Sequence, residues 1–156
     1  YMKEAYHTMR PKFTLGWMAE ALYSSKNFSE NYTATMMQAG EFAPTPHSKL
    51  MYNEAFRANQ YVAAGIKPIY VLNDMFQFRT EFYGFTPIFP IKKNALNKAY
   101  YGKAFSRFEY IGEVSIICHL PFGAISAYVN HYSSPRKEWN VGMTIGWQLF
   151  NYRFVE

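Results

Sequence analysis

Residues 140–150 read Asn-Val-Gly-Met-Thr-Ile-Gly-Trp-Gln-Leu-Phe, and this stretch decides the fold class. Apolar side chains alternate along it with small or polar ones, which is the period of a β-strand with one apolar side. One side carries Val141, Met143, Ile145, Trp147 and Leu149, and the other carries Gly142, Thr144, Gly146 and Gln148. A tilted strand of about ten residues can cross a lipid bilayer. The stretch therefore predicts a transmembrane strand with a lipid-facing side and a side toward a wet lumen.

Two stretches upstream repeat this period. Residues 109–120 and 125–130 both alternate, and Pro121-Phe122-Gly123 between them has the residues of a tight turn. A short polar join, residues 133–138, leads to the last strand. Three antiparallel strands are therefore expected over residues 109–150. A soluble sandwich with its two faces exchanged would show the same alternation, so the remainder of the chain has to be considered.

Weaker alternation marks further strands toward the N-terminus. They are expected at residues 13–20, 32–42, 76–83 and 100–105, with 3–7 as another candidate and 55–64 as an alternative to a loop. No segment shows the 3.6-residue period of a helix. Bacterial barrels have an even number of strands. We therefore expect an all-β, antiparallel transmembrane β-barrel in which residues 1–156 supply seven to eight strands, as the C-terminal half of a barrel of about 16. The alternative is an eight-stranded barrel that begins at residues 3–7.

Composition fits this expectation, although an aromatic-rich soluble sandwich would share it. Of the 156 residues, 49% are apolar, 20% aromatic and 17% charged, yet the mean hydropathy is −0.26 because apolar and polar residues are interleaved. Soluble domains carry nearer 25% charged residues, whereas membrane barrels have aromatic girdles. No run approaches the ~18 apolar residues of a membrane helix. The sequence starts at Tyr1 and contains no signal peptide, which an outer-membrane protein needs, so a processed chain or, more in keeping with the strand count, a part of a longer one is expected.

The net charge of +5 raises the question of an anionic partner. Lys and Arg are not clustered as on a nucleic-acid-reading helix, so no nucleic acid is expected. Many lie in apparent loops, namely Lys92, Lys93, Lys98, Lys103, Arg136 and Lys137. Anionic headgroups of outer-membrane lipid or lipopolysaccharide are the expected partner.

The search for catalytic and cofactor-binding motifs is negative. The chain has no Gly-x-Ser-x-Gly, phosphate loop, His-Glu-x-x-His or Cys-x-x-Cys. Its single cysteine, Cys118, excludes an internal disulfide and common zinc patterns. His119 is expected to project with Glu113 and Ser115, which is more typical of a lumen-facing polar row than of a Ser/His/acid site. We therefore expect no enzyme activity, cofactor or metal in this chain. The side chains expected in the lumen are Arg57, Arg79, Glu81, Glu109, Glu113 and His119.

The final strand contains a more specific pattern. Residues 140–147 follow the pattern polar, any, glycine, any, any, apolar, any, apolar. The four defined positions are occupied by Asn140, Gly142, Ile145 and Trp147. This resembles the C-terminal signal by which the assembly machinery selects outer-membrane strands. The resemblance implies insertion by that machinery into the outer membrane of a Gram-negative bacterium.

Residues 110–130 resemble the penultimate hairpin of the bacterial surface antigen superfamily, the barrels of outer-membrane assembly and translocation proteins. Members of that family tuck an external loop into the lumen through a Val-Arg-Gly-Phe/Tyr motif. The matching place here is Phe56-Arg57-Ala58-Asn59, where alanine replaces the glycine. The resemblance implies a lumen-inserted loop over residues 43–70. Arg57 would then bond to Glu81, Glu109 or Glu113.

Two short sequence segments are similar to one branch of that family. They are Phe56-Arg-Ala-Asn-Gln-Tyr61 and Arg79-Thr-Glu-Phe-Tyr-Gly-Phe-Thr-Pro87. The similarity is to the barrel that follows a patatin-like phospholipase domain in Bacteroidetes proteins, and it spans residues 40–156. It implies a membrane anchor or translocation pore joined to an N-terminal lipase domain, none of whose dyad lies in this chain. The alternatives are the barrel of an assembly or secretion factor and a soluble lipid-binding β-barrel.

Overall fold

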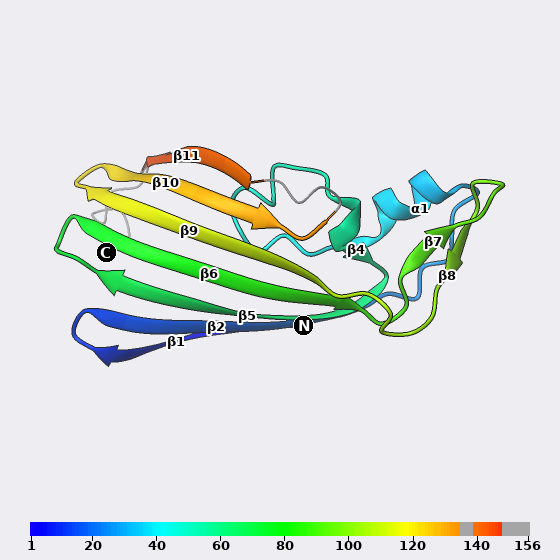
Figure 1. The fold of residues 1–156 in the computed structure, drawn as a ribbon, viewed down its shortest axis with the longest axis horizontal. Helices are drawn as coiled ribbons and strands as arrows, with labels where there is room; N and C mark the ends of the chain where they lie inside the picture. The colour runs from blue at the N-terminus through cyan, green and yellow to red at the C-terminus, as the bar shows by residue number, and fades with distance from the viewer. Residues whose placement is uncertain (135–138, 148–156) are drawn as a thin grey trace, which may run out of the picture.

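Seven long strands form one antiparallel sheet in the computed structural model, which describes residues 1–134 and 139–147 (Figure 1). Across the sheet the order is β1-β2-β5-β6-β9-β10-β11. The strands are β1 (Met2–Arg10), β2 (Phe13–Tyr23), β5 (Gln60–Val71), β6 (Phe76–Pro87), β9 (Glu109–Leu120), β10 (Gly123–Tyr132) and β11 (Trp139–Trp147). The predicted all-β, antiparallel class is confirmed. Within the described residues no pairing joins β1 to β11, so the sheet is open and no closed barrel is observed.

The connections differ sharply between the two ends of the sheet. At one end the strands are joined by short turns at residues 11–12, 72–75 and 121–122. At the other end residues 24–59 and 88–108 form long connections. Figure 1 shows α1 (Tyr32–Gln38), β7 (Ile91–Lys93) and β8 (Ala99–Tyr101) of these connections beyond the strands. The Asn73 side chain accepts the N–H groups of Met75 and of Phe76, the first residue of β6, which explains one of the tight turns.

The connection 24–59 contains α1 (Tyr32–Gln38), β3 (Gly40–Glu41), η1 (Glu54–Phe56) and β4 (Arg57–Ala58). The strand predicted at residues 32–42 is therefore wrong for most of its length. Asn31 starts the helix because its side chain accepts the Ala34 N–H at 2.8 Å. Met36 in the helix and the C-cap residue Ala39 are buried together with Ile91 of β7 (Ile91–Lys93). No helix among the described residues has the length and apolar character needed to cross a membrane.

Strand β5 corrects the expected inserted loop of residues 43–70. Residues 60–71 pair with β2 on one side and β6 on the other, so only the part before residue 60 is a loop. Alternation in the segment is clear, since Tyr61 and Ala63 are buried while Val62 is exposed. Pro68, which lacks an N–H, lies where the β5–β6 pairing is interrupted.

The connection 88–108 forms a small hairpin apart from the main sheet. Its strands are β7 and β8 (Ala99–Tyr101), so the strand predicted at residues 100–105 starts one residue earlier and ends sooner. Phe105 has a φ of 51°, a left-handed conformation that ends any extended run. Asn97 in the hairpin turn has a φ of 56°, which asparagine tolerates well.

The main core lies between the sheet and the part of the long loop that follows β3. Loop residues Phe42, Ala55, Phe56 and Ala58 are buried against side chains from five strands. Those strand residues are Met18, Tyr61, Ala63, Tyr83, Phe85, Ile111 and Tyr132. The loop therefore covers one face of the sheet and leaves the other face uncovered.

Candidate functional site

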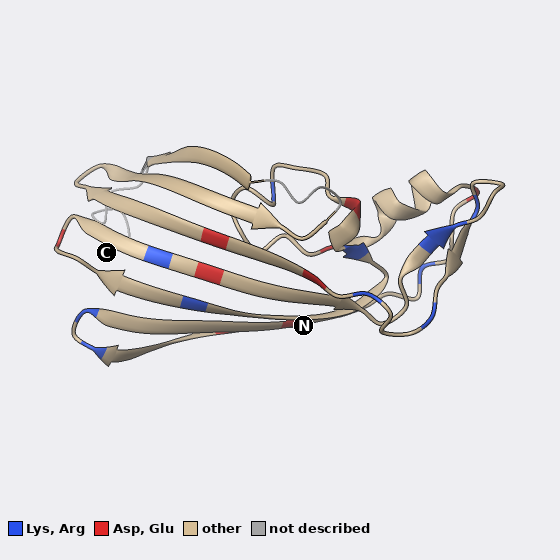
Figure 2. Ribbon diagram, in the orientation of Figure 1, with Lys and Arg blue, Asp and Glu red and all other residues tan. Residues whose placement is uncertain are grey.

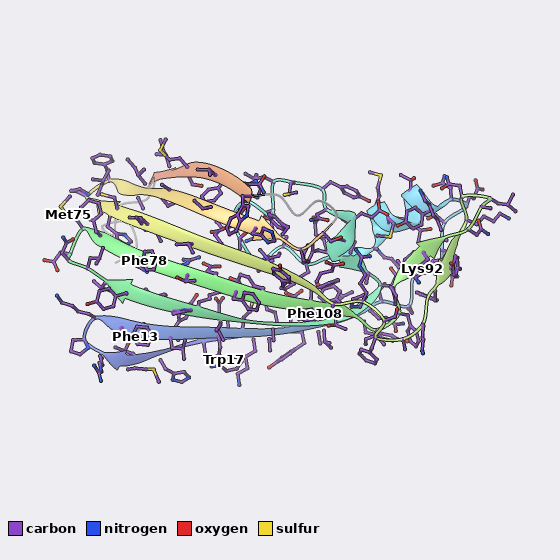
Figure 3. The ribbon with its side chains drawn as sticks, viewed as in Figure 1. Phe13, Trp17, Met75, Phe78, Lys92 and Phe108 are labelled. Carbon is purple, nitrogen blue, oxygen red and sulfur yellow. The ribbon has the colours of Figure 1, made fainter. Side chains whose placement is uncertain are left out.

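The uncovered face of the sheet, called here the apolar face, is built from every second residue of each strand. Strand registers place on it the odd residues of β1, β2, β10 and β11 and the even residues of β5, β6 and β9. Rows of apolar side chains run across it from strand to strand, for example Trp17, Ile66 and Phe82. Figure 3 labels Phe13, Trp17 and Phe78 among the side chains of this sheet.

The apolar face is exposed to an unusual degree. Val141 is 79% exposed, Ile116 50% and Phe82 48%, although each lies within a regular strand. From β2 to β11 the described part of this face contains no Asp, Glu, Lys or Arg. On β1 it contains Lys3, whose ammonium lies over the Trp17 ring at 5.7 Å, and at the end of the strand Arg10, the register partner of Phe13. Soluble proteins rarely expose so large a continuous apolar patch, which marks a surface that contacts lipid or another apolar partner.

The height of the apolar face matches a lipid bilayer. On β9 the charge-free side runs from Tyr110 to Leu120, which corresponds to about 33 Å along a strand at ~3.3 Å per residue. A tilt of about 40° would reduce this to roughly 25 Å, the height of the apolar band on outer-membrane barrels.

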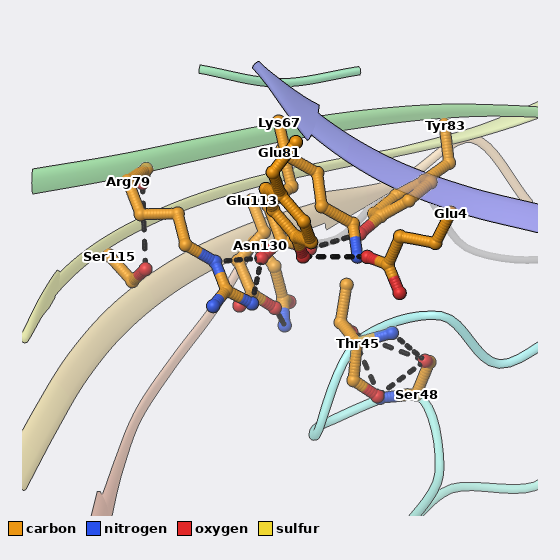
Figure 4. Close-up of polar contacts among 11 residues, drawn as sticks. Glu4, Thr45, Ser48, Lys67, Arg79, Glu81, Tyr83, Glu113, Ser115 and Asn130 are labelled. Carbon is orange, nitrogen blue, oxygen red and sulfur yellow. Dashed lines mark hydrogen bonds and ion pairs between the residues drawn. The ribbon is translucent and has the colours of Figure 1, made fainter. Parts of the chain in front are cut away.

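The opposite face, called here the polar face, holds the charged side chains of the sheet. Lys67 on β5 forms an ion pair with Glu4 on β1, and Arg79 forms one with Glu81 on β6 (Figure 4). The hydroxyl of Tyr83 also donates to Glu81, whose side chain is fully buried. Figure 2 shows acidic and basic positions along the middle strands β5, β6 and β9. Because each buried charge has an opposite charge or a donor, the polar face can hold them without leaving them unpaired.

A second carboxylate lies directly across from the first. Glu113 on β9 is the register partner of Glu81 and also faces Asn130 on β10. The Asn130 amide donates to Glu113 at 3.4 Å, while its own oxygen is buried without a partner. This cluster forms one continuous polar row across β5, β6, β9 and β10.

The predicted lumen residues of the strands all lie on the polar face. Glu109 accepts from the Arg107 guanidinium at 2.7 Å and from Ser133. His119 lies 3.1 Å from the side-chain oxygen of Gln77. The alternation of β9 thus placed Glu109, Glu113 and His119 correctly on one side of the sheet. Whether that side is a lumen stays a prediction.

Arg57 has different partners from those expected. Its Nη1 donates to the carbonyl oxygens of Met36, Met37 and Ala39 at 3.1–3.3 Å, and its Nη2 contacts Glu41 at 2.6 Å. The acids proposed for it are engaged elsewhere, and the expected bond to Glu81, Glu109 or Glu113 is wrong. Arg57 instead satisfies carbonyl groups at the end of α1 that no further helical turn could bond. Sequence spacing could not reveal this because the helix itself was not predicted.

We expect Arg57→Lys to loosen the loop that covers the polar face. A lysine ammonium cannot bond to the three carbonyls and the Glu41 carboxylate together, whereas the planar guanidinium does. The loss should be about 1–2 kcal/mol. Trypsin should then cut after exposed Lys49 roughly 5- to 30-fold faster. Arg10→Lys, on exposed β1, is the matched control, and equal cutting rates for both variants would contradict this role of Arg57.

His47 connects the same loop to the sheet. Its Nδ1 lies 2.9 Å from the Tyr132 hydroxyl, and burial lowers the pKa of the imidazole below its ordinary value. The neutral ring is therefore favoured where it packs against the sheet.

Three tyrosines of the polar face each lie over a glycine on the neighbouring strand. Direct register partners are Tyr6 and Gly16, Tyr83 and Gly65, and Tyr128 and Gly142. In each case a Cβ on the glycine would overlap the tyrosine side chain. Such pairs fix strand register because only glycine leaves room for the ring.

The C-terminal pattern is only partly described. Asn140 is the register partner of Asn130, and Gly142 lies beneath Tyr128. Val141, Met143 and Ile145 lie on the exposed apolar face, as their alternation predicted. The backbone of Trp147 pairs with Gly123, and Leu149 lies outside the described residues.

Within residues 1–134 and 139–147, no group of three or more His, Cys, Asp or Glu side chains could hold a metal ion. A comparison with known protein families, curated proteins and solved structures finds no match for this chain.

Proposed function

We propose that this chain is part of a transmembrane β-barrel in the outer membrane of a Gram-negative bacterium, where it acts as a membrane anchor or translocation pore. The observation that carries the proposal is the separation of charge between the two faces of the sheet. The apolar face is exposed and charge-free from β2 to β11 over the described residues, while the charges lie on the covered polar face. This arrangement suits lipid on one side and an interior on the other.

The asymmetry of the connections supports the same proposal. Outer-membrane barrels have short turns at the periplasmic end and longer loops at the outer end. Here the short turns at residues 11–12 and 121–122 share one end, and the long connections 24–59 and 88–108 share the other. We infer that this second end faces outward.

The open sheet would be completed by further strands that pair with the edges β1 and β11. A barrel of about 16 strands would need roughly as many again, supplied by the N-terminal part of a longer parent chain. The resemblance to barrels of patatin-like phospholipase proteins supports an anchor for a lipase domain. The alternative barrel of an assembly or secretion factor would be indicated instead by tandem periplasmic modules in the same polypeptide.

A soluble lipid-binding barrel would place the apolar face inside and the polar face in water. The core formed by Phe42 and Phe56 argues against this arrangement, because the loop covers the charged face. Because the loop packs on the polar face, we infer that this face points toward the interior of the barrel and not toward bulk water.

Thiol labelling tests the membrane proposal directly. With Cys118 replaced by alanine, we expect Val141→Cys to resist an aqueous maleimide when the protein is folded in bilayers. The same cysteine should react when the protein is unfolded in denaturant without detergent. Thr144→Cys, a neighbour on the polar face, should react in both. Both positions are exposed in the isolated sheet, so exposure alone predicts equal labelling. Equal labelling in bilayers would therefore overturn the proposal.

A further inference from the structure

The hairpin connection, residues 88–108, carries the whole excess of positive charge. The chain has 16 Lys and Arg against 11 Asp and Glu. Five of these cations and no acid lie in the hairpin connection, so the remaining 11 cations balance the 11 acids. Figure 2 shows basic positions on β7 and on the loops around it, at the end of the molecule with the long connections.

Three of the five cations are exposed and free to bind an external anion. Arg107 is paired with Glu109, and the Lys93 ammonium lies over the Tyr32 ring at 5.9 Å. Lys92, Lys98 and Lys103 are exposed and form no ion pair with a described residue. Unpaired lysines that cluster without acids create a local positive potential.

The hairpin is held in place on one side and free on the other. Ile91 is buried against α1, and the Tyr101 ring lies 4.4 Å from that of Phe28. Lys92 and its cross-strand partner Tyr100 lie on the other side of the hairpin and are exposed. Figure 3 labels Lys92 on this hairpin, beyond the end of the main sheet.

Exposed apolar side chains accompany the lysines. Leu96 is 78% exposed at the hairpin tip, and Phe105 is 61% exposed. Phe108 lies over Gly84, so the hairpin connection is continuous with the apolar face of the sheet. Lysines beside exposed aromatic and aliphatic side chains are typical of the interface between lipid chains and charged headgroups.

We propose that the hairpin connection binds the phosphate groups of anionic glycolipid headgroups in the leaflet next to the outward end of the sheet. The proposal rests on the proposed function, which places that end at the outer surface. Charge complementarity selects the occupant, because lysines without acids bind phosphate and the adjoining apolar face requires lipid chains beside it. Each lysine near an anionic membrane surface strengthens binding by about fivefold.

The test uses a fluorophore at the hairpin tip. Leu96→Cys is labelled in a Cys118→Ala background, and the protein in neutral detergent micelles is titrated with diphosphorylated lipid A. Replacing Lys92, Lys98 and Lys103 by glutamine should raise the half-maximal lipid concentration at least about tenfold. The matched control replaces Arg10, Lys12 and Lys49 by glutamine, which removes the same charge away from the hairpin. It should titrate like the parent.

Two further titrations identify the ligand. Dephosphorylated lipid A, and inorganic phosphate at equal phosphate concentration, should both give little response. The proposal is overturned if the hairpin variant titrates like the parent, or if either substitute matches lipid A. Insertion of the parent into neutral phosphatidylcholine vesicles, followed by protease protection of the strands, tests the proposed function separately. Failure of insertion would therefore be distinguishable from failure of headgroup binding.

Discussion

Met143→Arg is expected to prevent stable membrane insertion, while Thr144→Arg is tolerated. Met143 is 66% exposed on the apolar face, and Thr144 is an exposed neighbour on the polar face of the same strand. An arginine on the lipid side of a barrel costs about 2–4 kcal/mol near the bilayer midplane. The ratio of folded to unfolded Met143→Arg protein in vesicles should therefore fall by roughly 30- to 1000-fold. On the polar face the same side chain would remain in water or near the carboxylates.

Heat-modifiable migration in SDS gels after folding into vesicles measures this difference. The two substitutions add the same charge and the same volume one residue apart, so each serves as the control of the other. In a soluble protein both sites would be exposed surface positions, where a substitution changes stability by about 0.5 kcal/mol or less. Comparable folding yields for the two variants would exclude lipid contact at Met143.

The last strands could be predicted from sequence because their alternation is regular and their turns are short. In β9 and β10 apolar side chains alternate with polar or small ones, apart from Ile111 and Ile117, and Pro121 and Gly123 mark the turn between the strands. A period of two then fixes which side chains share a face, including Glu109 and Glu113. The alternation could not show whether the sheet closes, since closure depends on strands that pair with its edges.

The long loop could not be predicted because its structure depends on tertiary contacts. Residues 32–38 form a helix because Asn31 caps it and Met36 packs against β7. Each of these features involves only a few residues, so neither produces a long periodic pattern in the sequence. Arg57 was singled out from a motif, but its partners are the helix carbonyls and Glu41. An Asn cap followed by apolar residues at helical spacing could have indicated the helix.

Pairing across strands is another feature that single-strand patterns miss. Lys67 and Glu4 are far apart in sequence and meet only because β1, β2 and β5 lie side by side. The tyrosine–glycine pairs likewise become visible only when the register is known. Once the register is known, these pairs identify glycines at which an added methyl group would overlap the tyrosine ring and lower stability.

Gly65→Ala is expected to destabilise the sheet by roughly 2–3 kcal/mol, because an added Cβ overpacks a filled site. The Cβ would overlap the Tyr83 ring and lie 2.9 Å from the Phe82 carbonyl oxygen. Tyr83 is fully buried and its hydroxyl is bonded to Glu81, so the ring cannot move aside without breaking that contact. The midpoint of urea unfolding in detergent micelles, followed by tryptophan fluorescence, should fall accordingly.

Gly112→Ala is the matched control on the apolar face. Its nearest neighbour would be a Phe82 ring carbon at 4.0 Å, and it borders a hollow of about 400 Å³ that Phe82 and His131 also line. The added methyl fits there, and alanine reduces the freedom of the unfolded chain, so stability should stay equal or rise by up to ~1 kcal/mol. A generic cost of replacing strand glycines would lower both midpoints alike. If the Tyr83 ring requires a glycine at position 65, the urea midpoint of Gly65→Ala falls and that of Gly112→Ala does not.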